Sequence, residues 1–183
     1  MSEQRDRIEA RSPVLERLAD LARADDGLLA DAVRADLPGS APLGEEIAAS
    51  PRAQGHDADL PLVVEAVHEG YLLHHGDSRV IDDSDPDLAL LAGDRLYAAG
   101  LEQLATAGDL ESVRALADVI ALSAAAHAAA DTQLAAAIWD AGCAEIGWGS
   151  SPALDAAKIA AQTGEKGASE ALIDAATQAR GTA

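Results

Sequence analysis

The sequence predicts an all-α protein, an antiparallel bundle of about six to seven helices, and two observations carry that prediction. Of the 183 residues, 44 are alanine and only four are aromatic, so the core must be built from small side chains, which suits close-packed helices better than sheets. Apolar residues also recur at helical spacing in several segments, and no alternating pattern predicts a strand. The length predicts one domain over residues 1–183.

In the first half of the chain, helix starts are marked by capping residues followed by proline. Ser12 and Pro13 open a first helix, which "DDG" at residues 25–27 kinks or ends. Prolines and glycines then predict a loop over residues 38–59, with room for one turn around "GEEIAAS". A second helix is expected over residues 60–75, where apolar positions form a stripe.

The second half repeats the same signals. Asp85 and Pro86 open a helix that Gly108 closes, and Asp109 caps the next, over residues 110–130. That helix is apolar on nearly all sides, so we expect it to be central. Residues 132–149 continue or follow it, and a weaker helical segment is expected over residues 151–183.

Composition excludes several classes of partner. The formal charge is -19, from 32 acids and 13 bases, which leaves no basic surface for nucleic acid or an anionic membrane. No apolar run approaches the ~20 residues that cross a bilayer, and "MSEQRDR" is not a secretory signal. The single Cys143 excludes an internal disulfide. We therefore expect a soluble cytoplasmic protein with no nucleic-acid partner and no direct membrane insertion; composition leaves open whether the acidity reflects a high-salt environment.

The richest segment is "EAVHEGYLLHHGDSR", residues 65–79. Glu65 and His68 can meet one helical turn apart, and His74 and His75 fall where the helix dipole favours an imidazolium. Di-iron bundles use Glu-x-x-His twice, whereas this segment has it once, so a histidine bonded to the neighbouring glutamate is favoured over a metal ligand. A metal-dependent helical hydrolase using these four residues and Asp77 stays as an alternative.

Three other polar groups have simpler explanations. His127 and Asp131 stand four residues apart and predict a hydrogen-bonded pair. "GHD" at residues 55–57 resembles the His-Asp of helical phosphohydrolases but falls in the predicted loop. "IDDSDPD", residues 81–87, predicts a solvated turn and helix cap rather than a magnesium motif. No segment predicts a catalytic nucleophile.

Two segments resemble helices of the trans-isoprenyl diphosphate synthases. In that all-α family one helix reads E-x-x-H-x-x-x-L-x-H-D-D-x-x-D, whose aspartates hold magnesium on an allylic diphosphate, and a following helix begins A-x-L-x-G-D. The first pattern is matched by Glu65, His68, Leu72 and His74, and the second by Ala89, Leu91, Gly93 and Asp94. The resemblance covers about 45 residues, from Glu65 to roughly Gly108, of the chain.

The departures from the family pattern concern its chemistry. His75 and Gly76 stand where the aspartate pair belongs, and Arg79 stands in place of the third aspartate, where it would repel a hard cation. The connecting segment is short and lacks the diphosphate-binding Arg-Arg-Gly, and the second aspartate-rich motif is absent from the sequence. The chain thus resembles the small, non-catalytic subunit of two-component synthases that make long polyprenyl diphosphates.

This resemblance implies an accessory or regulatory subunit without catalytic residues, metal or cofactor, whose partner is a catalytic prenyl diphosphate synthase or a second copy. A helical binding protein with an apolar pocket is a further alternative. The candidate ligand or partner contacts are Glu65, His68, His74, His75, Asp77 and Asp94. We also expect the helix from Asp85 to pack on the Glu65 helix, burying Leu88, Leu91 and Leu96 and placing Asp94 near Glu65 or His68.

Overall fold

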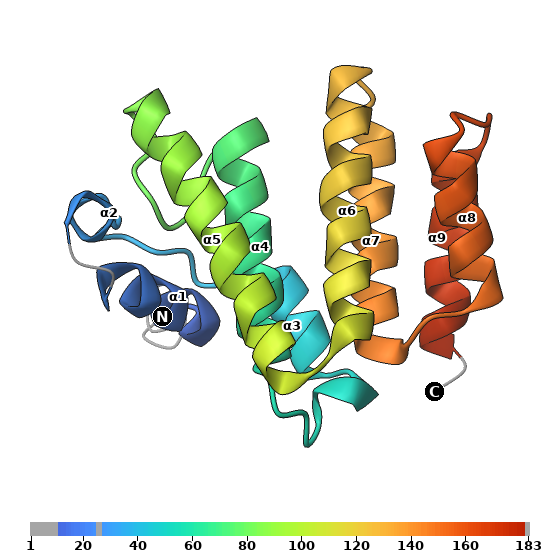
Figure 1. Cartoon of the computed structure of the whole chain (residues 1–183), viewed down its shortest axis with the longest axis horizontal. Coiled ribbons are helices and arrows are strands. Elements are labelled where there is room, and N and C mark those ends of the chain that lie inside the picture. The colour runs from blue at the N-terminus through green and yellow to red at the C-terminus, as the bar shows by residue number, and fades with distance from the viewer. Residues whose placement is uncertain (1–10, 25–26, 182–183) are drawn as a thin grey trace, which may run out of the picture. The chain divides into compact units, whose positions relative to one another are not determined.

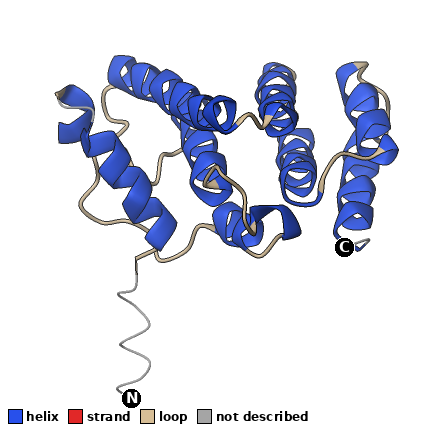
Figure 2. Cartoon of the chain, turned by 60° about the horizontal axis from the view of Figure 1, so that its bottom comes forward, coloured by secondary structure: helices blue, strands red, loops and turns tan. Residues whose placement is uncertain are grey.

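The computed structural model describes residues 11–24 and 27–181, and these ranges are built from helices and loops (Figure 2). Their only β-type pairing is an isolated antiparallel bridge between Val33 and Ile81. The prediction of an all-α fold is confirmed. The helices are α1 Pro13–Ala24, α2 Leu28–Asp31, α3 Pro42–Ala48, α4 Leu60–His75, α5 Pro86–Ala107, α6 Leu110–Ala128, α7 Thr132–Trp148, α8 Pro152–Gln162 and α9 Ala168–Gly181, with a 3-10 turn, η1, at Pro51–Ala53.

The described chain divides into two compact units. Unit 1 comprises residues 11–24, 27–45 and 59–103, and unit 2 comprises residues 46–58 and 104–181. The division therefore falls inside α3 and near the end of α5. That the two units fold together as one domain stays a prediction.

The core of unit 1 joins α1 to α4, α5 and the 80–81 segment. Leu15, Leu18 and Leu96 are completely buried in it, with alanines filling the space between them. The segment after α2 lies beside the segment before α5, because the Arg34 amide donates to the Val80 carbonyl (2.8 Å) and Arg34 Nη2 contacts Asp83 Oδ1 (2.8 Å). These contacts hold the 78–83 loop against the rest of the unit.

Helices α4 and α5 run side by side in unit 1 (Figure 1) and approach unusually closely at glycines. A Cβ on Gly70 would lie 2.9 Å from the Gly93 carbonyl oxygen, and one on Gly93 would lie 2.7 Å from Nε2 of His74. Only glycine permits this approach. The expected packing of these two helices on each other is confirmed.

Unit 2 is built around α7, which packs against α6 and α9, while α8 packs against α9. At the α6–α7 contact, a Cβ on Gly142 would overlap a methyl group of Val119. Arg52, in η1, donates to the Ile146 carbonyl (3.0 Å) and contacts Asp109 Oδ1 (3.3 Å). These bonds fasten η1 to the end of α7 and the start of α6.

Several helix boundaries are confirmed and several details are not. The starts of α5, α6 and α8 follow the predicted caps at Asp85, Asp109 and Ser151, each of which accepts from a backbone amide of the first turn. The hydroxyl of Ser12, in contrast, is buried and bonds to nothing within the described ranges, although α1 begins as expected.

Two predictions about secondary structure and burial were wrong. The expected loop over residues 38–59 contains α3 and η1, because Pro42 begins a helix whose Glu45 side chain accepts from the Ala41 amide (2.9 Å). Helix α6 is buried on one face only, and α7 is the most buried helix of unit 2. Several alanines of α6 are exposed, so the number of apolar residues in its sequence overestimates how much of the helix is buried.

Among the described helices, none is long and apolar enough to cross a membrane.

Candidate functional site

A pair of buried carboxylates on α4 is the centre of the candidate site. Glu65 and Glu69 lie one turn apart on the same helix, and both are 0% exposed. Two carboxylates cannot remain charged without solvent unless cations or hydrogen-bond donors replace the lost water. Their partners therefore decide what this part of the molecule can do.

Arg79 supplies the positive charge between them. Its Nε lies 2.5 Å from Glu69 Oε1 and its Nη2 lies 2.5 Å from Glu65 Oε2. The same Nη2 lies 3.2 Å from Nδ1 of His68. Because a guanidinium only donates, the Nδ1 atom of His68 accepts this bond and its ring proton is assigned to Nε2. His68 is thus held by Arg79, and its distance to Glu65 Oε2 is 3.9 Å, too long for the predicted hydrogen bond.

Backbone and hydroxyl donors complete the network. Glu65 Oε1 accepts from the Gly44 amide (2.6 Å), which belongs to α3. Glu69 Oε2 accepts from Ser78 Oγ (2.7 Å) and from the amides of Arg79 (3.0 Å) and Val80 (3.3 Å). The two carboxylates therefore tie α3, α4 and the 78–83 loop together.

The electrostatics favour the charged forms of Glu65 and Arg79. Burial acts to raise the pKa of Glu65, but the nearby His68, the charge of Arg79 and the Gly44 amide together hold that pKa below its usual range. Burial acts to lower the pKa of Arg79, but the charges of Glu69 and Glu65 raise it. The network is an internal ion cluster with one cation between two anions.

The three imidazoles of α4 lie beside the two tyrosines of α4 and α5. His68 stacks on Tyr71 (ring centroids 5.9 Å apart), and His74 stacks on Tyr97 of α5 (5.4 Å). His75 lies at the exposed end of α4 and contacts Tyr71 in a tilted arrangement (5.4 Å). Burial, Tyr71 and Asp94 raise the pKa of Tyr97 to about 12.

The two family-like segments meet at His74 and Asp94. Nε2 of His74 lies 3.2 Å from Asp94 Oδ1, although within the described part of the chain it makes no hydrogen bond. This contact corrects the expected neighbour of Asp94, which was Glu65 or His68. The predicted burial of Leu96 is confirmed at 0% exposure, whereas Leu91 is 68% exposed and Leu88 is half-buried.

Of the six candidate residues, the structure therefore brings Glu65 and His68 to Arg79, and His74 to Asp94. His75 and Asp77 are exposed, and the His75 ring lies 6.0 Å from that of His74. Within residues 11–24 and 27–181, no set of three or more His, Cys, Asp or Glu side chains is placed to hold a metal ion.

The remaining polar motifs have structural roles. Asp82 accepts from the Ser84 amide (3.0 Å) and Asp83 from the Ser78 amide (3.1 Å). Nε2 of His56, in the "GHD" motif, lies 2.9 Å from Oδ2 of Asp109. Asp131 caps α7 by accepting from the Leu134 amide (2.9 Å).

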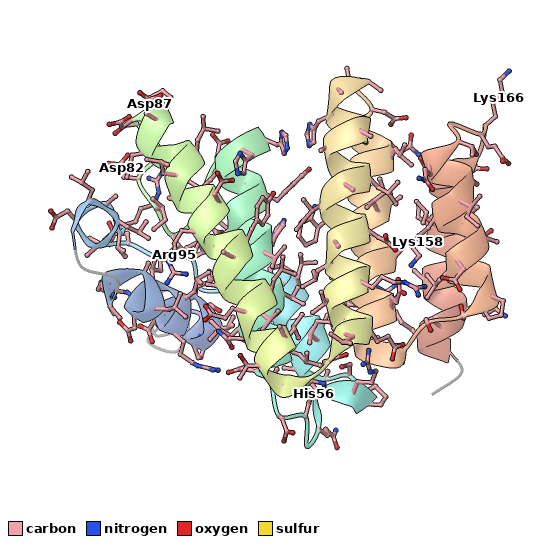
Figure 3. All side chains as sticks on the ribbon, viewed as in Figure 1. His56, Asp82, Asp87, Arg95, Lys158 and Lys166 are labelled. Carbon is pink, nitrogen blue, oxygen red and sulfur yellow. The ribbon has the colours of Figure 1, made fainter. Side chains whose placement is uncertain are left out.

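Unit 2 contains a second ion cluster, which no sequence pattern predicts. Lys158 extends from α8 toward α6 and α7 (Figure 3). Its Nζ lies 3.0 and 2.9 Å from the two oxygens of the buried Glu145 and 3.0 Å from Asp118 Oδ2. These partners are 13 and 40 residues from Lys158 in the chain, so no local spacing reveals them. Arg114, Asp155 and Ile159 help to line a cavity of about 400 Å³ beside it.

Comparisons of the chain with protein-family models, with curated proteins and with solved structures gave no match. The structure alone therefore defines the class of protein. It is a helical protein in which the guanidinium of Arg79 binds two buried carboxylates of α4, the helix that carries the Glu-x-x-His motif.

Proposed function

We propose that this chain is a non-catalytic accessory subunit that pairs with a catalytic prenyl diphosphate synthase. The observation that carries the proposal is the position of Arg79, which stands where the similar synthases have a metal-binding aspartate. Here its guanidinium bridges the buried carboxylates of Glu65 and Glu69. In the similar synthases this helix presents ligands to magnesium, whereas here the carboxylates of α4 are neutralised by Arg79 of the same chain.

The packing of α4 on α5 supports the same proposal. The synthase-like segments lie against each other at Gly70 and Gly93, and His74 meets Asp94 across the contact. A packed pair of helices is what the resemblance implies, and the positions of its metal-binding aspartates hold His75, Gly76 and Arg79. Such a protein would act by binding another chain rather than by transferring a prenyl group.

The test is co-expression of this chain with the synthase of the same genome that carries both aspartate-rich motifs. We expect the two to co-purify as a defined complex, and we expect the complex to differ from the synthase alone in activity or product length. The chain alone should make no product from an allylic diphosphate, isopentenyl diphosphate and magnesium. Product made by this chain alone, or a synthase that neither binds it nor changes in its presence, would overturn the proposal.

A further inference from the structure

Over residues 89–92 of α5, the alanines are buried and the leucines are exposed, whereas Leu96, one turn further on, is buried. Ala89 and Ala92 face the core of unit 1 and are 5% and 2% exposed. Leu90 and Leu91 are 48% and 68% exposed. A helix stabilised only by its own unit would be expected to bury leucine in preference to alanine, because leucine removes more apolar area from water. This inverted pattern explains why the predicted burial of Leu91 failed.

Leu90 and Leu91 also differ from other exposed apolar residues. Single exposed side chains are normal on protein surfaces. Among the large apolar residues exposed in the described ranges, Leu90 and Leu91 are the only adjacent pair; the others are Leu28, Leu110, Ile159 and Ile173. Neighbouring residues of a helix point in different directions, so the two leucines spread exposed apolar area over one side of α5, and we call this area the patch.

Acidic residues border this patch on the same helix. Asp87 and Asp94 lie three or four residues from both leucines, so the four side chains share one face of α5, and both aspartates are exposed. We call these four residues the α5 face. Asp82, also exposed, lies at the same end of unit 1 as Asp87 (Figure 3). Arg95, also exposed, lies four residues after Leu91 and borders the same side of α5, where the two aspartates outnumber it.

The charges of the α5 face decide between two occupants. In a symmetric contact with a second copy, Asp87 and Asp94 would approach the same residues of the other chain, and each chain carries a formal charge of -19. Like charges placed opposite each other at an interface oppose binding. A partner with an apolar depression bordered by lysine or arginine would instead match both the leucines and the aspartates.

We propose that the α5 face is the surface that docks on the catalytic synthase, and that the synthase receives it with an apolar patch bordered by basic residues. This inference rests on the proposed function and names the surface that performs it. Leu90 and Leu91 supply the apolar contact, and Asp87 and Asp94 steer the encounter. The steering makes association faster at low salt than at high salt.

The experiment measures binding of the full chain to the purified synthase by calorimetry and by association kinetics at two salt concentrations. Leu91→Asp should weaken binding at least tenfold, because it puts a charge in the centre of the apolar contact. Asp87→Lys should slow association and flatten its salt dependence. The matched controls are Leu28→Asp, at a leucine 74% exposed on α2, and Asp174→Lys, at an exposed aspartate of α9; each should change the affinity less than twofold. Circular dichroism and thermal melting establish that each variant is folded.

The outcomes separate the two proposals. If the unmodified chain binds the synthase but Leu91→Asp and Asp87→Lys bind equally well, the accessory function stands and the α5 face is not the docking surface. If the unmodified chain does not bind, both proposals fail. If it forms a dimer of its own that Leu91→Asp dissociates, the α5 face is a self-association surface and the heterologous assignment is overturned.

Discussion

Replacing Arg79 by methionine would remove the cation from two buried carboxylates while keeping most of the side-chain volume. Glu69 would retain the Ser78 hydroxyl and the amides of residues 79 and 80, whereas Glu65 would retain only the Gly44 amide and the nearby His68. Removing one partner of a buried ion pair typically costs about 3–5 kcal/mol. We expect a loss in that range at pH 7, a large share of the roughly 5–15 kcal/mol that stabilises an ordinary protein.

The pH dependence distinguishes this mechanism from lost packing. In the unmodified protein the pKa of Glu65 is lowered, so its contribution to stability is present above the ordinary value of 4.5 and is lost as pH falls through the lowered value. In the Arg79→Met variant burial is no longer opposed by Arg79, so the pKa of Glu65 rises above its unfolded value. The penalty is then absent below about pH 4.5 and grows as pH rises. The difference between the two proteins should therefore shrink on acidification.

Urea unfolding between pH 4 and 8 measures this difference. The same substitution at Arg23, whose pairing with Asp20 is exposed, is the control and should cost less than about 0.5 kcal/mol. Adding Glu65→Gln to Arg79→Met should recover much of the loss, because it removes the uncompensated charge. A loss below 1 kcal/mol at pH 7, or one that is constant with pH, would contradict the assignment of Arg79 as an internal counter-ion.

Three further predictions follow from contacts in each unit. Lys158→Met should destabilise unit 2 by about 3 kcal/mol, because both oxygens of the buried Glu145 lose their cation. Tryptophan fluorescence should report this loss, since both tryptophans belong to that unit. Gly93→Ala should cost about 1–3 kcal/mol in urea unfolding, because the added methyl group meets the His74 ring at 2.7 Å. Ultraviolet titration should show a phenolate that forms only near pH 12, and Tyr97→Phe should abolish that step.

Each of these has its own check. Gly181→Ala is the control for Gly93→Ala, since nothing lies within 4 Å of its added Cβ. A Gly93→Ala variant as stable as the parent would show that α4 and α5 do not touch there. A Lys158→Met variant with unchanged tryptophan unfolding would show that Glu145 does not depend on Lys158. Both tyrosines titrating at their usual pKa would mean that the rings of Tyr71 and Tyr97 are more open to solvent than described.

Local signals in the sequence predicted the long helices well, because caps act within one turn. Asp85 with Pro86, and Ser151 with Pro152, each mark a start that the structure places at the same residue. The same rules predict only a turn where α3 lies, because the prolines around it also indicate a loop, whereas Pro42 occupies the first position of a helix. A proline excludes a helix interior but is compatible with a helix start, and the sequence pattern alone does not distinguish the two.

Contacts between distant residues could be predicted only in part. The spacing of Glu65 and His68 correctly placed them on one turn of α4, but their shared partner Arg79 enters from the loop after the helix. The Gly93-Asp94 motif correctly placed α5 on α4, but the register was set by the glycine contact, which turned Leu91 outward. Small residues decide how closely two helices approach each other, and the distance between two helices cannot be predicted from helical periodicity alone.

The distribution of charge links these findings to the proposed function. Although acids outnumber bases 32 to 13, arginines or lysines contact the most buried carboxylates in both units. Arg79 contacts Glu65 and Glu69, and Lys158 contacts Glu145. Two of the 13 bases are therefore committed to buried carboxylates, and most of the 32 acids are left for the surface. Carboxylates bound to internal cations are poor ligands for a metal, whereas exposed aspartates beside exposed leucines suit a basic protein surface. The placement of these two bases is what we expect of the proposed accessory subunit, which would act through its surface.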